Sequence, residues 1–109
     1  MEIRIEGQFS KAEVDELRTE MIGALISLDT GFDSDRVLKI LGELTEAQIS
    51  SFKSFLLRLL GAKTIKTLVI TKGEDKIEIE NVDPNDLNTV VIAIQKMSTS
   101  LKQDDKDAD

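Results

Sequence analysis

Hydrophobic and polar residues alternate in three short runs of the sequence. In the first run, Met1–Glu6, the hydrophobic residues Ile3 and Ile5 stand between charged neighbours. The other two runs are Thr64–Thr71 and Lys76–Glu80. Such alternation is typical of a β-strand with one buried and one exposed face. The sequence therefore predicts a strand in each run.

The second and third runs flank Gly73-Glu74, which predicts a β-hairpin. Glycine at the first central position suits a two-residue type II′ turn, and that turn places Thr71 opposite Lys76. In this register, the apolar residues that face one another are Ile70 with Ile77 and Leu68 with Ile79. The polar residues of the two strands then share the opposite face.

Three longer stretches repeat hydrophobic residues at helical spacing, and each begins with a capping signature. Ser10–Glu13 and Thr45–Gln48 have the pattern of capping boxes, in which the first and fourth side chains bond each other's backbone amides. Asp83-Pro84 places an acceptor at the N-cap and proline at the first helical position. Glycine predicts the end of the first helix at Gly31 and of the second at Gly61. The inward-facing residues, helix by helix, are Val14, Leu17, Met21, Ala24, Leu25 and Leu28; Ile49, Phe52, Leu56 and Leu59; and Leu87, Val90, Val91, Ile94 and Met97.

A further short helix is predicted over Asp35–Glu43, where hydrophobic residues again stand three and four apart. The element order is then β-α-α-α-β-β-α. This order predicts an α+β domain, with a small three-stranded antiparallel or mixed sheet and helices packed on one face. The domain covers residues 1–102. Residues 103–109 form an acidic tail with almost nothing to bury, and we expect this tail to be disordered.

Composition narrows the available chemistry. The chain has 109 residues, the size of one domain, and it contains neither cysteine nor histidine. Without histidine it lacks the commonest general base and the commonest metal ligand. Twenty-one acidic against 14 basic residues give a formal net charge of −7. This charge disfavours nucleic acid and anionic membranes as partners and favours a protein with a basic patch.

The compartment is predicted from the same features. The first residues alternate charged and aliphatic side chains and do not form the apolar segment of a signal peptide. The absence of cysteine removes any need for an oxidising compartment. We therefore expect a cytoplasmic protein.

Asp29-Thr30-Gly31 matches the tripeptide of aspartic proteases. That chemistry needs two aspartates that share one proton, on loops between strands. Here the tripeptide follows a hydrophobic stripe of helical spacing, and Gly31 is a natural helix end. A bare tripeptide also has a high false-positive rate, so we do not assign a protease.

Two other groups have simpler explanations than a ligand site. Asp29, Asp33 and Asp35 could offer oxygen ligands to calcium or magnesium, but their spacing does not fit an EF-hand loop. Capping of the predicted short helix is the better explanation for Asp33 and Asp35. The lysines at positions 63, 66 and 72 are too sparse for a nucleic-acid surface and lack aromatic stacking partners. We assign no catalytic, cofactor-binding or metal-binding residue.

The polar face of the predicted sheet is the candidate partner-binding surface. Antiparallel sheets often leave one face in water, so a plain solvated face is the alternative. The residues expected to bind a partner are Arg4, Glu6, Thr67, Val69, Thr71, Lys76, Glu78 and Glu80. Glu2 would lie beside them, and Ile65 would add an apolar position.

The layout from Ile49 to Met97 resembles the back half of bacterial effector-associated constant component domains. It consists of a helix, the strand runs Lys66–Ile70 and Lys76–Glu80, and a closing helix. Met1–Glu6 followed by a helix is similar to their front half. The resemblance implies a small non-enzymatic α+β component of a bacterial multi-component conflict system. It carries over no functional residue.

The function expected from these observations is non-catalytic. We expect an adaptor or accessory domain that binds another protein. The alternative is a small acidic inhibitor or immunity-type protein that blocks a basic active site or a nucleic-acid-binding groove.

Overall fold

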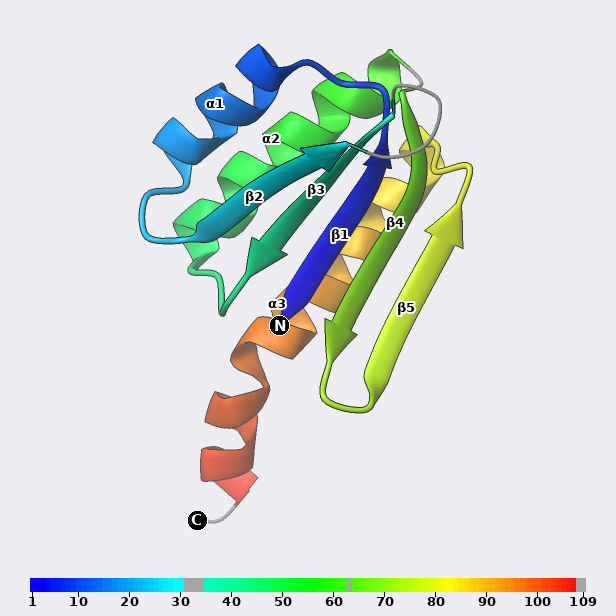
Figure 1. The fold of residues 1–109 in the computed structure, drawn as a ribbon. Helices are drawn as coiled ribbons and strands as arrows, with labels where there is room; N and C mark the ends of the chain where they lie inside the picture. The colour runs from blue at the N-terminus through cyan, green and yellow to red at the C-terminus, as the bar shows by residue number, and fades with distance from the viewer. Residues whose placement is uncertain (31–34, 63, 108–109) are drawn as a thin grey trace.

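The computed structural model of the chain describes residues 1–30, 35–62 and 64–107 (Figure 1). Strands and helices are interspersed along these residues. In chain order the elements are β1 (Glu2–Gly7), α1 (Lys11–Glu20), β2 (Leu25–Thr30), β3 (Arg36–Leu41), α2 (Glu46–Gly61), β4 (Ile65–Lys72), β5 (Asp75–Glu80), the short 3₁₀ helix η2 (Pro84–Asp86) and α3 (Leu87–Asp107).

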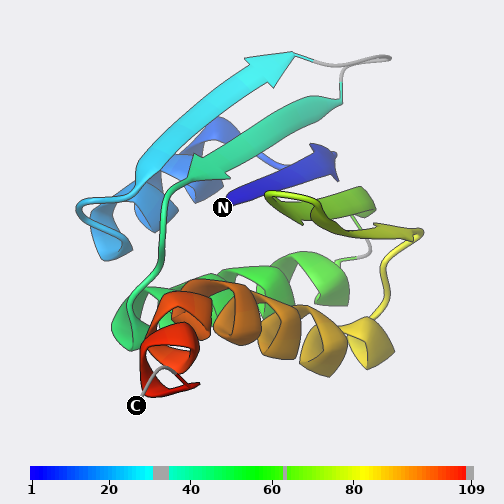
Figure 2. The same ribbon diagram turned by 90° about the horizontal axis from the view of Figure 1, so that it is seen from below.

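The strands form one antiparallel sheet in the order β2-β3-β1-β4-β5. The α-helices of the described residues lie on the same side of this sheet, and its other face is left open (Figure 2). The predicted α+β class, with helices on one face, is confirmed. The predicted three-stranded sheet is wrong, because the described residues form a sheet of five strands.

The covered face of the sheet and the helices share one hydrophobic core. Ile3 and Ile5 of β1 are fully buried, because β1 is the central strand and helices cover its inner face. On the helix side, the rings of Phe52 and Phe55 stack with centroids 6.3 Å apart. Burial of Ile3 and Ile5 sets which way β1 faces, so its alternate residues point to the open face.

The hairpin between β4 and β5 has the predicted register. Thr71 pairs with Lys76, and Ile70 pairs with Ile77. Gly73 has a φ of +59°, and Glu74 is not among the residues of positive φ. Positive φ at the first loop residue alone is the type II′ arrangement, since type I′ needs it at both. The predicted turn is therefore confirmed.

The predicted helix starts are also confirmed. The Ser10 hydroxyl accepts from the Glu13 amide, and the Thr45 hydroxyl accepts from the Gln48 amide. Both boxes are complete, because the side chains of Glu13 and Gln48 accept from the N-cap amides in return. Asp83 caps the third start, where the turn η2 precedes α3. These caps fix where each helix begins to cover the sheet.

The first helix is shorter than predicted, and this correction changes the sheet. Helix α1 ends at Glu20, and the residues expected to complete it form β2. Gly23 has a φ of +98°, a conformation that ends a right-handed helix. Ile26 and Leu28 pack against the core, whereas Leu25 is 69% exposed. The helical spacing of Leu25 and Leu28 was therefore misleading over so short a run.

The short helix predicted over Asp35–Glu43 is also wrong, since most of this segment is β3. Its hydrophobic residues fit both a helical and an alternating pattern. In the structure, Leu38 lies opposite Ile5 and Ile40 lies opposite Ile3. A strand is favoured here because the backbone amides and carbonyls of the buried strand β1 need partners along both edges.

Some predictions lie outside the described residues. They are the helix end at Gly31, the capping or ligand role of Asp33, the place of Lys63 among the three sparse lysines, and the disorder of residues 108–109. Helix α3 continues to Asp107, into the segment 103–109 for which the sequence predicts disorder. The division into a domain and a disordered tail stays a prediction.

Candidate functional site

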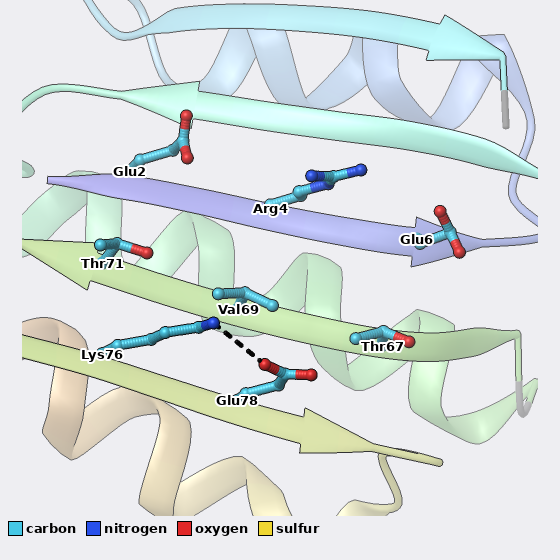
Figure 3. A pocket seen from close by; sticks show the side chains of 8 residues that line it. All are labelled: Glu2, Arg4, Glu6, Thr67, Val69, Thr71, Lys76 and Glu78. Carbon is cyan, nitrogen blue, oxygen red and sulfur yellow. Dashed lines mark ion pairs between the residues drawn. The ribbon is translucent and has the colours of Figure 1, made fainter.

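The open face of the sheet carries a shallow hollow of about 490 Å³. Figure 3 looks onto this face, with the sheet in front of the helices. The side chains come from β1, β4 and β5 and project from the sheet toward the viewer. They are Glu2, Arg4, Glu6, Thr67, Val69, Thr71, Lys76 and Glu78.

The hollow brings together nearly all of the predicted partner-binding residues. The exception is Glu80, which lies beyond the hollow, opposite Thr67 on the same face. The placement of Ile65 on this face was wrong, because its side chain is buried in the core. Between Glu6 and Gly7 the pairing with β4 shifts by one residue. Such a bulge reverses the side to which the next residue points, and it turns Ile65 inward.

The pairing register aligns the outward residues of all five strands in three rows that cross the sheet. We name each row after its residue on β1. From β2 to β5, the Glu2 row is Leu25, Leu41, Glu2, Thr71 and Lys76; the Arg4 row is Ser27, Lys39, Arg4, Val69 and Glu78; and the Glu6 row is Asp29, Val37, Glu6, Thr67 and Glu80.

Sequence reasoning missed the part of each row that β2 and β3 contribute. Lys39 was assigned to a helix, so its position beside Arg4 could not be predicted. The signal that was available is the alternation of Leu38 and Ile40 around Lys39, which is the pattern of a half-buried strand. With β2 and β3 included, the candidate site extends well beyond the hollow.

The charges on the open face are unevenly distributed. Lys39 and Arg4 occupy directly opposite positions on neighbouring strands. The Glu6 row instead holds three carboxylates, those of Asp29, Glu6 and Glu80. The face is therefore basic at its centre and acidic along one side.

One end of the open face is apolar. Leu25 and Leu41 lie opposite each other in the Glu2 row, and they are 69% and 43% exposed. Ile22, in the connection before β2, is 82% exposed. At the other end of this row, Lys76 pairs with Glu78 at 3.3 Å, with both side chains exposed (Figure 3). An exposed ion pair of this kind contributes little stability, so these two side chains can rearrange around a partner.

The other predicted ligand groups do not form sites in the described part of the chain. No group of three or more acidic side chains suited to a metal ion occurs among these residues. The Nζ atom of Lys66 lies 2.7 Å from Oδ2 of Asp35, whose side chain is 4% exposed. The Nζ atom of Lys72 pairs with Glu43 at 2.9 Å. These lysines serve internal ion pairs and do not form a basic surface.

The expectation that the Asp29-Thr30-Gly31 tripeptide follows a helix was wrong. Asp29 and Thr30 end strand β2 and do not follow a helix, while Gly31 is outside the described residues. Asp29 is solvent-exposed and belongs to the Glu6 row. A proton-sharing dyad needs a second carboxylate held close to the first, and because the tripeptide occurs once in the sequence, the chain would have to dimerise to supply it. The tripeptide therefore carries no assignment.

No family model, curated protein or solved structure matches the chain. Within the described residues, no helix is both long and apolar enough to cross a membrane. The open face of the sheet is therefore the feature of the molecule that bears on its function.

Proposed function

We propose that this chain is a non-catalytic protein-binding domain, an adaptor or accessory component, that docks its partner on the open face of the sheet. The observation that supports this proposal is the asymmetry of the sheet. One face is packed by helices, and the other carries a hollow lined by charged and hydroxyl side chains (Figures 2 and 3). These groups can form hydrogen bonds and ion pairs with a protein surface, and the sequence supplies no thiol or imidazole for catalysis.

The charge of the open face suggests the chemistry of the partner. Its three rows contain five carboxylates and three cationic side chains, and the whole chain has a formal net charge of −7. A partner with a basic patch would be attracted both by the carboxylates of the open face and by the net negative charge of the whole chain. We propose a cytoplasmic setting, and the resemblance of layout adds a bacterial multi-component system as the context.

The Glu6 row favours a second candidate function, an acidic inhibitor of a basic active site or nucleic-acid groove. It places carboxylates at three of its five positions. Charge mimicry acts through screened electrostatics, so an inhibitor would lose affinity steeply as salt rises. An adaptor that uses Leu25 and Leu41 would respond weakly to salt.

Comparative capture from the native host tests the proposed function. The bait proteins are the unmodified chain, the double variant Glu6→Lys/Glu80→Lys, and the control Glu20→Lys. Glu20 is an exposed residue at the end of α1, so the control makes the same kind of charge reversal away from the open face. Mass spectrometry should identify a protein held by the unmodified chain and by Glu20→Lys, but lost with the double variant, because the added lysines would repel a basic patch.

A partner retained equally by the face variant and the control would contradict the proposed use of the open face. Circular dichroism on each bait excludes misfolding as the cause of a loss. The charge changes lie at solvent-facing positions, so all three proteins should melt within a few degrees of one another.

A further inference from the structure

The centre of the open face contains an unfavourable arrangement of charge. Arg4 and Lys39 are directly opposite on antiparallel neighbours, a position where like charges destabilise a sheet. The ion pairs within the described residues include neither of them. Two adjacent cations at the middle of a face are therefore available to a carboxylate from outside, although the chain itself is acidic.

We infer that the open face binds an α-helix of a different protein, and that this helix places an acidic side chain against Arg4 and Lys39. The inference rests on the proposed function and specifies its partner. The same helix places a basic side chain against the Glu6 row and an apolar side chain against Leu41.

A second copy of this chain is a poor occupant, because the charge pattern opposes stacking of two open faces. A twofold axis parallel to the central strand β1 would set Arg4 against Arg4 and Glu6 against Glu6. A twofold axis across the strands, along the Arg4 row, would set Arg4 against Arg4 and Glu2 against Glu6. Like charges would meet in both cases, and such contacts suppress association.

The width of the charge pattern fits one helix. An α-helix is about 10–12 Å across, and neighbouring strands are about 4.8 Å apart, so one helix covers about two strands. The apolar, basic and acidic positions follow one another on the adjacent strands β3 and β1, as Leu41, then Lys39 with Arg4, then Glu6. A second sheet would cover more strands and needs an apolar inner face, which the charged residues of β5 do not offer.

The spacing along the strands fits a helix as well. Successive rows are two residues apart, or about 6.7 Å. Residues four apart on one side of a helix are about 6 Å apart. A helix lying along β3 and β1 can therefore place apolar, acidic and basic residues, at four-residue intervals, against the three rows.

Two synthetic peptides test this inference directly. Each is an alanine-rich helix of about 18 residues, long enough to form in water. One carries Leu, Glu and Lys at four-residue intervals, and the other carries Leu, Lys and Glu. The middle residue lies opposite Arg4 and Lys39 in either direction of the helix, and it is Glu in the first peptide and Lys in the second. Binding is measured by NMR titration of the ¹⁵N-labelled chain.

The Glu-centred peptide should bind roughly threefold to tenfold more tightly than the Lys-centred peptide, the range expected for a few exposed ion pairs. Amide shifts should concentrate in β1 and β3. The variant Lys39→Glu should reduce or reverse the preference, whereas the control Lys53→Glu, on the exposed side of α2, should keep it. Equal binding, absent binding, a preference for the Lys-centred peptide, or shifts confined to α1–α3 would overturn the inference.

Failure of this inference can be told apart from failure of the proposed function. If capture from the host depends on Glu6 and Glu80 but the peptides are not discriminated, the open face is an interface and the inferred helix is wrong. If capture does not depend on these residues, the proposed function fails first. A dimer in sedimentation that Arg4→Glu dissociates would also overturn the inference, because it would identify a second copy as the occupant.

Discussion

Gly73 is the residue whose lack of a side chain most directly determines the local structure. Its φ of +59° lies in the left-handed region, which β-branched residues rarely adopt. A Cβ atom added at this position would meet no atom within 4 Å. A substitution therefore reports backbone conformation and not crowding.

Gly73→Val should destabilise the protein by about 1–3 kcal/mol, because valine must take the strained conformation or open the hairpin. Gly73→Asn is the matched control, since asparagine tolerates positive φ and should cost much less. Urea denaturation of the three proteins measures both changes. Equal stability of the valine and asparagine variants would mean that the turn in solution is not the one described.

At the scale of elements, the sequence was informative where two independent patterns agreed. The β4–β5 hairpin joins alternation to a turn glycine, and each of the three helix starts joins a capping signature to a hydrophobic stripe. Local interactions fix these features, so they could be predicted. The register of the hairpin then placed the β4 and β5 residues of the open face correctly.

Strands β2 and β3 could not be predicted because their patterns are short and fit two periods. Leu25 and Leu28 extend the stripe of α1 at helical spacing, while Ile26 and Leu28 alternate as in a strand. The choice between them is made by tertiary structure, as β1 needs a partner on each side. The position of Lys39 beside Arg4, on which the inferred helix site depends, was hidden by the same ambiguity.

The two interpretations of this segment make opposite predictions for adjacent residues. In a helix that continues α1, Leu25 would face the core and Ile26 would not. In β2, Ile26 packs against the core and Leu25 is 69% exposed. Ile26→Ser should therefore cost about 1–2 kcal/mol of stability, and Leu25→Ser should cost less than about 0.5 kcal/mol.

Thermal and urea denaturation of the two serine variants check this order. The substitutions are chemically similar and adjacent, so each serves as the control for the other. A larger loss for Leu25→Ser than for Ile26→Ser would contradict the strand and favour the helical interpretation.

At the scale of the whole molecule, the hydrophobic core and the acidic C-terminal segment lie in different parts of the chain. Among the residues whose side chains the structure describes, Met97 is the last of α3 in the hydrophobic core. Residues 103–109 contain four aspartates and one lysine. Negative charge near the C-terminal end of a helix opposes the helix dipole. Folding therefore gains little from this tail, and any contribution it makes concerns association.

Truncation after Lys102 should leave the melting temperature nearly unchanged, because it removes no residue of the described core. Its effect on a captured partner separates the two candidate functions. For an acidic inhibitor, loss of distributed negative charge should slow association and flatten the salt dependence of binding. For an adaptor that binds through the open face, affinity should stay nearly the same. Binding kinetics of the full and truncated chains at low and high salt measure the difference, and failure of the truncated chain to fold would contradict both expectations.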